Sequence, residues 1–305
     1  MFGRLTIRNL KTEILDKLNE LASVNERSVE GEVRYALAKW TESGHVDARV
    51  DELYREKISK RLMILMQQKN ELKNSSLKAS HVAERMGLDK GSIVEKWIIG
   101  EVEPTFEELN RLADYFSVDS GWLKHGDGMP FDKIYTRIPE QPQEAIEWLL
   151  KKERYDDLKK IVFIRCSSGG IYLVKVYDNE QSIVYYTPYV LDDSVGSGGF
   201  NSMIKLFIIW EELYKQYTKQ SDSSSLNNTN IIIQSYLFDE RDSKEFSEGN
   251  TDPLVILNKQ KTNEPWWEDV WESDEDKLRE YWPGCKEWCA LVNKHKVKKQ
   301  SAVIL

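Results

Sequence analysis

The sequence predicts a multidomain α+β chain: a strand with two short helices (residues 1–46), an all-helical unit of five helices (residues 52–130) and an α+β unit (residues 140–305). Three observations predict this. The 305 residues suit two or three domains of roughly 100–200 residues. Apolar residues follow helical spacing over most of the first two parts, and they form strand-like runs in the third. Polar stretches containing Gly or Pro separate the parts.

The composition predicts a folded protein and excludes several classes. Hydrophobic residues make up 40% of the chain and charged residues 31%, which excludes a disordered chain. No apolar run approaches the ~20 residues that cross a bilayer. The first five residues lack the charged and apolar regions of a secretory signal. With three cysteines, a disulfide scaffold is not expected. We therefore expect a soluble, cytoplasmic protein.

The net charge of −8 is unevenly distributed along the chain. Residues 51–100 carry a net charge of +3, whereas residues 101–132 carry −6 and residues 133–305 carry −5. Because contacts with phosphate are local, the acidic total does not exclude nucleic-acid binding. It does make nonspecific binding by the whole chain less favourable.

Residues 4–10 alternate as a strand, with Leu5 and Ile7 on one face. The opposite face carries the polar side chains Arg4, Thr6 and Arg8. Apolar positions at helical spacing follow over residues 11–22, and Ser28 is placed to cap a second helix. A lone strand has no partner for its backbone groups. We therefore expect two copies of the chain to pair these strands antiparallel, as a homodimer.

The strand Leu5–Leu10, the helix Glu13–Leu21 and the turn Asn25–Glu30 together resemble the Arc-type ribbon–helix–helix family of DNA-binding proteins, over residues 3–43. The resemblance implies that the paired strands lie in the major groove and read bases through Arg4, Thr6 and Arg8. It also implies that the second helix begins on a phosphate, at Ser28 and Val29. Two alternatives stay open: an ordinary edge strand and helical hairpin, or a module that only dimerises the chain.

Gly44 and the polar residues up to Asp51 predict a hinge, after which five helices are expected. Their predicted bounds are Leu53–Lys69, a short helix around Val82–Met86, Asp89–Ile99, Thr105–Phe116 and Ser120–Lys124. The motifs of this part are Val82–Leu88, Trp97, Gly100, Pro104, Leu109, Leu112–Phe116, Val118–Leu123 and Gly126–Gly128.

That order resembles the helix-turn-helix domain of lambda-repressor-like phage and bacterial regulators, over about 70 residues. The resemblance implies a recognition helix in the major groove and a phosphate contact near the start of the preceding helix. The residues that it implies for DNA are Lys78, Lys90, Ser92, Glu95 and Lys96. The spacing from Gly87 to Trp97 is one residue longer than usual, so the register of these residues is open by one. A helical bundle that no longer binds DNA is the alternative.

Beyond Ile134 the sequence resembles no family that we recognise, and its patterns predict an α+β domain. The expected helices are Gln143–Lys152 and Asn201–Tyr217. The expected strands are Lys160–Cys166, Ile171–Tyr177, Ser182–Tyr189, Ile231–Phe238 and Leu254–Leu257. Such a domain is long enough to hold a core or a ligand pocket.

Three motifs of this domain carry residues found in chemical sites, but each lacks a required partner. Cys166 precedes a tight turn, but no histidine is near it in the sequence. The Gly196–Gly199 loop lacks the Lys-Ser/Thr of a phosphate loop. Cys285 and Cys289, with His295 beyond, lack a fourth metal ligand. We therefore expect no catalytic residue, no metal and no cofactor.

The end of the chain is rich in tryptophan and then in lysine. Five tryptophans fall between residues 266 and 288: Trp266, Trp267, Trp271, Trp282 and Trp288. We expect most of them in the core; the alternative is an exposed surface for a ligand or partner. The Lys294–Lys299 run predicts a solvated tail, with contact to DNA phosphates as the alternative.

Taken together, the residues and resemblances predict a homodimeric, sequence-specific DNA-binding regulator and not an enzyme. The expected role is a nucleoid-associated repressor of a phage, phage-satellite or plasmid operon, bound to a double-stranded operator. Its third part would sense a small molecule or bind an inducing protein. The alternative is an antitoxin-like protein that regulates its own gene and neutralises a protein partner.

Overall fold

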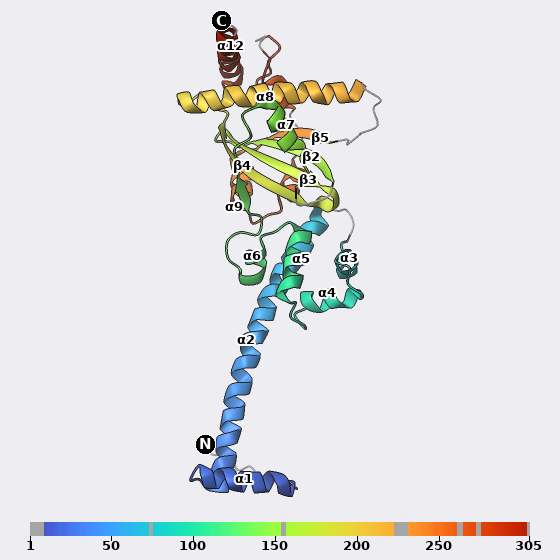
Figure 1. The fold of residues 1–305 in the computed structure, drawn as a ribbon, viewed down its shortest axis with the longest axis vertical. Coiled ribbons are helices and arrows are strands. Elements are labelled where there is room, and N and C mark those ends of the chain that lie inside the picture. Colours follow the sequence, from blue (N-terminus) through green and yellow to red (C-terminus); the bar gives the residue numbers. More distant parts are fainter. Residues whose placement is uncertain are drawn as a thin grey trace.

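The protein, described by a computed structural model, has an α+β architecture in which helices surround a mixed five-stranded sheet (Figure 1). The structure describes residues 9–72, 76–153, 157–222, 231–260, 265–272 and 276–303, with side chains described except at 40, 42–50, 217–222 and 299–303. None of the helices in these ranges is long and apolar enough to cross a membrane.

The described chain begins with a helical hairpin formed by α1 (Thr12–Val24) and the start of α2 (Val29–Leu72). We call residues 9–41 the N-terminal hairpin. Ser28 precedes α2, and its Oγ accepts a hydrogen bond from the amide of Gly31 at 3.1 Å. Both helices were predicted. Most of the predicted strand, including Arg4, Thr6 and Arg8, lies outside the described residues.

Helix α2 continues without interruption for 44 residues, which is about 66 Å at ~1.5 Å per residue. The hinge predicted between Gly44 and Asp51 is therefore wrong. Glycine costs a helix only about 1 kcal/mol relative to alanine, and the stretch contains no proline to break the backbone hydrogen bonds. One helix thus connects the N-terminal hairpin to the rest of the chain (Figure 1).

The second half of α2 packs with four short helices, and we call residues 52–132 the helical unit. These helices are α3 (Ala79–Arg85), α4 (Gly91–Ile98), α5 (Phe106–Phe116) and α6 (Ser120–His125). The predicted order of five helices is confirmed at this level. The unit has its own core, in which Ile58 and Leu62 of α2 pack with Trp97, Leu112 and Phe116.

Residues 133–303 form the sheet unit, whose strand order is β1-β4-β3-β2-β5. The strands are β1 (Lys133–Tyr135), β2 (Leu158–Arg165), β3 (Gly170–Tyr177), β4 (Ser182–Val190) and β5 (Ile232–Leu237). Strands β2, β3 and β4 pair antiparallel, whereas β1 pairs parallel with β4 and β5 parallel with β2. Strands β2 to β5 were predicted, but β1 was not.

Helices cover both faces of this sheet (Figure 1). One face packs against α7 (Pro142–Leu150), α8 (Ser197–Asp222), α11 (Trp266–Asp269) and α12 (Cys285–Val303). The other face packs against α9 (Glu240–Glu248), α10 (Pro253–Lys259) and the last turn of α2. A 3-10 turn, Asp178–Glu180, connects β3 to β4.

The strand predicted over Leu254–Leu257 is wrong, because these residues lie in α10. Pro253 occupies the first turn of this helix, and Asp252 caps it, since its Oδ1 accepts a hydrogen bond from the amide of Leu254 at 2.9 Å. A short, wholly apolar run has no periodicity that separates a buried strand from a buried helix.

The tryptophan cluster belongs mainly to the core of the sheet unit, as expected. Trp266 and Trp267 are fully buried, and Trp282 and Trp288 are 7% and 5% exposed. Trp266 packs edge to face against Trp210 of α8, with ring centroids 5.3 Å apart. These rings join α8, α11 and the segment before α12 in one apolar layer.

The helical unit and the sheet unit are joined by a buried ion pair. Lys69 Nζ lies 2.9 Å from Asp252 Oδ2, and the two side chains are only 5% and 1% exposed. The same ammonium group donates a hydrogen bond to the carbonyl oxygen of Glu180 at 2.7 Å. Gln68 Oε1 accepts from the amide of Asp252 at 2.8 Å. The end of α2 is therefore held to α10 and to the β3–β4 turn.

Candidate nucleic-acid interface

Helices α3 and α4 form a compact pair whose geometry depends on two glycines. Gly87, between the helices, has a φ of +65°, a left-handed conformation that favours glycine. Gly91 begins α4, where an added Cβ would lie 2.9 Å from the Cβ of Ser80. The starts of the two helices therefore approach too closely for a larger residue. Val82 and Trp97 bury the inner faces of the pair.

The structure places all five residues predicted on this pair at the surface. Lys78 lies just before α3 and Lys90 just before α4, and both side chains are exposed. On α4 the exposed residues Ser92, Glu95 and Lys96 share one face, at the i, i+3 and i+4 spacing of a helix. Val94 and Trp97 occupy the opposite, buried face. An open, mainly polar helix face is thus available to a partner.

One of these residues already has an ionic partner. Lys96 Nζ lies 2.9 Å from Glu101 Oε1, with the two side chains 47% and 53% exposed. An exposed pair of this kind contributes about 0–1 kcal/mol, so it can be exchanged for another anion. Lys96 must nevertheless leave Glu101 before it contacts a phosphate.

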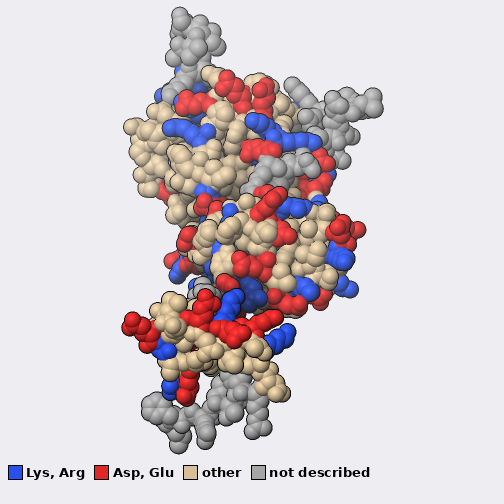
Figure 2. All heavy atoms as spheres, turned by 60° about the horizontal axis from the view of Figure 1, so that its bottom comes forward, with Lys and Arg blue, Asp and Glu red and all other residues tan. Residues whose placement is uncertain are grey.

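Net positive charge on the helical unit lies on the second half of α2 and on the α3–α4 pair, and not on α5 and α6. Residues 78–96 carry four basic and three acidic side chains, whereas residues 97–132 carry two basic and eight acidic ones. On the face drawn in Figure 2, the described basic and acidic side chains are intermingled and form no broad basic patch. The arrangement suits a few local phosphate contacts better than strong nonspecific binding.

The N-terminal hairpin exposes the residues that would form its core. Ile14, Leu15 and Leu21 of α1 are 50%, 45% and 47% exposed, and Leu37 of α2 is 37% exposed. Among the apolar residues described in this hairpin, only Ala22 is buried. Of the two residues predicted to meet a phosphate here, Ser28 is exposed and Val29 half-buried. A single copy of the hairpin therefore has no apolar core of its own.

The cysteine motifs of the sequence form no catalytic or metal site among the described residues. Cys166 is buried, and burial raises the pKa of its thiol. Cys285 Sγ and Cys289 Sγ are 3.9 Å apart, whereas His295 packs its ring against Phe200. In the described residues, no group of three or more His, Cys, Asp or Glu side chains could hold a metal ion.

The Gly196–Gly199 segment runs into the start of α8, which begins at Ser197. The carbonyl oxygen of Gly198 accepts a hydrogen bond from Ser202 Oγ at 3.1 Å, as within an ordinary helical turn. The basic residues Lys294–Lys299 lie in α12, where Lys296 Nζ is paired with Glu211 Oε2 at 2.8 Å.

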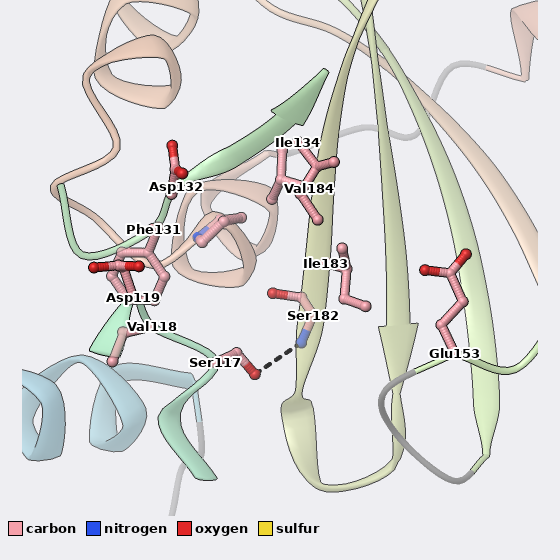
Figure 3. Close-up of a pocket in the computed structure, with 11 residues that line it drawn as sticks. Ser117, Val118, Asp119, Phe131, Asp132, Ile134, Glu153, Ser182, Ile183 and Val184 are labelled. Carbon is pink, nitrogen blue, oxygen red and sulfur yellow. Dashed lines mark hydrogen bonds between the residues drawn. The ribbon is translucent and has the colours of Figure 1, made fainter. Parts of the chain in front are cut away.

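Sequence reasoning missed a cavity of about 340 Å³ between the helical unit and the sheet unit (Figure 3). We call it the junction cavity. It is lined by Ser117, Val118, Asp119, Phe131, Asp132, Ile134, Glu153, Ser182, Ile183, Val184 and Pro253. These residues come from the α5–α6 turn, the segment entering β1, the loop after α7, β4 and the start of α10. No local motif could have predicted the cavity, because its walls are far apart in the sequence.

Two hydroxyl groups lie at the base of the junction cavity. Ser117 Oγ accepts a hydrogen bond from the amide of Ser182 at 3.1 Å, which joins the two units. In Figure 3, Ser182 and Val184 point from β4 toward the loop that carries Ser117, whereas Ile183 points to the other side of the strand. Ser182 is only 8% exposed.

Glu153 lies at the far side of the cavity and is held by two donors. Its Oε1 accepts from Lys175 Nζ at 2.8 Å, and its Oε2 accepts from the hydroxyl of Tyr185. Burial raises the pKa of Glu153, but these hydrogen bonds outweigh it and hold the pKa below its usual range. Lys175 is fully buried, with its ammonium group 4.4 Å from the ring centre of Trp148.

Comparison with known proteins adds no identification: no family model, no curated protein and no solved structure matches this chain.

Proposed function

We propose that the protein is a homodimeric, sequence-specific DNA-binding regulator. The observation that carries the proposal is the exposed face of α4, with lysines placed just before α3 and α4. Ser92, Glu95 and Lys96 form that face on a short helix whose other side is buried in the core of the helical unit. A helix of this kind fits the major groove, where polar side chains reach base edges.

The flanking lysines support the same orientation. Lys78 and Lys90 precede the two helices and are exposed, and we propose that they contact phosphates of the DNA backbone. Glu95 would accept a hydrogen bond from a cytosine amino group, and Lys96 would donate to guanine or to a phosphate. The resemblance to lambda-repressor-like domains implies the same residues for DNA contact.

The N-terminal hairpin supports the dimer. Its exposed residues Ile14, Leu15 and Leu21 would gain a core if a second copy packed against them. We propose that two chains pair here, with the strand around Arg4, Thr6 and Arg8 reading DNA as in ribbon–helix–helix proteins. Because α2 is continuous, each N-terminal hairpin is held by a helix that also belongs to the helical unit.

Two modules on one chain would act together. Once the first is bound, the second binds at a millimolar effective concentration, so affinity rises about 10²–10⁴-fold where the geometry permits. This arrangement suits a nucleoid-associated repressor that covers an extended operator in a phage, phage-satellite or plasmid operon. The sheet unit would then receive the inducing signal, from a small molecule or a protein.

The test is a footprint of the purified protein on the DNA upstream of its own gene. We expect protection of two adjacent and distinct elements, one for each module. Protection of a single element would leave the other module for dimerisation. No protection at nanomolar to micromolar protein would contradict the proposal and favour a role in binding protein partners.

A further inference from the structure

We propose that the junction cavity binds a small organic cation, an ammonium group attached to a short apolar body. The cavity is defined by its eleven lining residues and encloses about 340 Å³. Small-molecule sites in proteins span about 300–1,000 Å³, so the volume suits a compact ligand. The claim that the ligand regulates DNA binding rests on the proposed function. The claim that the ligand binds in the cavity does not depend on it.

The charge of the cavity selects the ligand. Asp119 and Asp132 line it, and none of the described lining residues is Lys, Arg or His. The charge of Glu153 is balanced by Lys175, so Glu153 adds little to the negative potential of the cavity. Lys133, which follows Asp132 in the chain, donates its ammonium group to the carbonyl oxygen of Ser247 at 3.0 Å. The two aspartates therefore set a negative potential, which favours a cation and repels an anion.

Each aspartate keeps one carboxylate oxygen available. Asp119 Oδ1 accepts from the amide of Trp122 at 2.7 Å, and Asp132 Oδ1 accepts from the amide of Lys133 at 2.8 Å. No described residue bonds Oδ2 of either aspartate. An ammonium group has three N–H donors and would find a charged acceptor in either aspartate.

The side chain of Ser182 provides an independent indication of a ligand. Ser182 is more than nine-tenths buried, and its side chain points into the space beside Ser117 and Val118 (Figure 3). Its amide is bonded to Ser117, but no described residue bonds its hydroxyl. An N–H donor of a ligand in the cavity would give this hydroxyl a hydrogen-bond partner.

The remaining walls are apolar and would hold the body of the ligand. Phe131 and Val184 lie on the same side of β4 as the Ser182 hydroxyl, together with Val118 and Ile134 (Figure 3), and Pro253 also lines the cavity. A fully hydrophilic cation would leave this surface in contact with water. An alkyl or phenyl group of a few carbons would cover it.

The position of the cavity connects the ligand to the helical unit. The hydrogen bond between Ser117 and Ser182 lies in its wall, and Gln181 Nε2 donates to the carbonyl oxygen of Asp114 at 3.0 Å nearby. A bound cation at Ser182 would therefore contact both units at their junction. If the protein is a DNA-binding regulator, a ligand in the junction cavity would shift the position of the helical unit, and with it the α3–α4 pair, relative to the sheet unit.

The experiment is isothermal titration calorimetry of the full chain with 2-phenylethylammonium chloride. We expect saturable binding of one cation per chain. The neutral alcohol of the same shape, 2-phenylethanol, should bind at least tenfold more weakly, and 3-phenylpropanoate should not bind. Absence of saturable binding by the ammonium ion, or equal binding by the alcohol, would overturn the proposal.

Matched variants locate the site. Asp132→Asn and Ser182→Ala should each weaken binding of 2-phenylethylammonium at least fivefold, whereas Asp127→Asn, an exposed aspartate outside the lining, should not. Equal loss in Asp127→Asn, or no loss in both lining variants, would refute this location. If Ser182→Ala fails to fold, the exposed Asp132→Asn variant decides. Calorimetry needs no DNA, so its result stands even if the footprint is negative.

Discussion

Removal of the buried Lys69 charge is expected to weaken the junction between the helical and sheet units. In Lys69→Met the side chain keeps most of its length but loses the ammonium group, so Asp252, which is 1% exposed in the pair, loses its cation. Breaking a buried pair by removing one partner costs about 3–5 kcal/mol. The Lys69 ammonium group also donates to the carbonyl oxygen of Glu180, which would lose this donor. We therefore expect the free energy of unfolding to fall by about 3–5 kcal/mol.

The assay is urea unfolding followed by tryptophan fluorescence, because Trp97 and Trp210 report on the cores of the two units. The double variant with Asp252→Asn should recover part of the loss, since the amide is neutral and retains an oxygen that can cap α10. Lys60→Met is the control. Lys60 pairs with Glu56 at 3.6 Å on the surface, and its loss should cost no more than ~0.5 kcal/mol.

Two outcomes would refute this reasoning. The first is a loss in Lys69→Met no larger than in Lys60→Met, which would mean that the junction contributes little to stability. The second is a double variant as unstable as Lys69→Met alone. In that case the unpaired charge of Asp252 is not what destabilises the protein.

Four further predictions concern the dimer, DNA binding and pH. Leu21→Glu should leave the helices intact and halve the mass measured by sedimentation, because the side chain is exposed in one copy and would be buried in a pair. Arg8→Ala should weaken specific DNA binding by ~1–3 kcal/mol. Lys96→Ala should lower the slope of log affinity against log salt concentration by about one unit if Lys96 contacts a phosphate. Glu101→Gln removes the ionic partner of Lys96 and should tighten DNA binding. Hydrogen bonds lower the pKa of Glu153 in the folded protein despite its burial. The ionised carboxylate therefore stabilises the fold at pH values above the pKa of glutamate in the unfolded chain. This stability is lost as the pH falls through the lowered pKa of the folded state. Glu153→Gln should therefore show a smaller loss of stability in acid, measured by urea unfolding at several pH values.

Each of these predictions has a contrasting outcome. Leu53→Glu changes another exposed leucine, on α2 outside the N-terminal hairpin, and should not change the mass; if it does, the hairpin is not the specific interface. Unchanged DNA affinity in Arg8→Ala would mean that the predicted strand over residues 4–10 only dimerises the chain. Lys57→Ala, on an exposed part of α2, should leave the salt slope unchanged. Equal acid sensitivity of Glu153→Gln and wild type would refute the role of that carboxylate.

Helices with local signals were predictable from the sequence. The helix α5 begins with a capping box, in which Thr105 and Glu108 bond each other's backbone amides, and this pattern is visible in the residues alone. Gly87 ends the pattern of α3, and apolar spacing identifies the buried face of α4. Such signals act within a few residues, so they need no knowledge of distant contacts.

Elements decided by distant contacts were not predictable. Strand β1 has only three residues and forms because β4 offers an edge to it. The helix α10 has an apolar sequence that would equally suit a buried strand. The junction cavity is composed of segments such as those around Ser117 and Ser182, which nothing in the sequence brings together.

The sequence by itself determined the order of helices in the helical unit, four of the five strands, and which residues of α4 would be exposed. Only the tertiary structure decided that α2 runs unbroken past Gly44 and that Lys69 is buried against Asp252. It also placed Ser182 beside the helical unit, so that a cavity lies between them. The physical reason is range: propensity, capping and periodicity act over one or two helical turns. The junction depends on burial and pairing between groups more than a hundred residues apart.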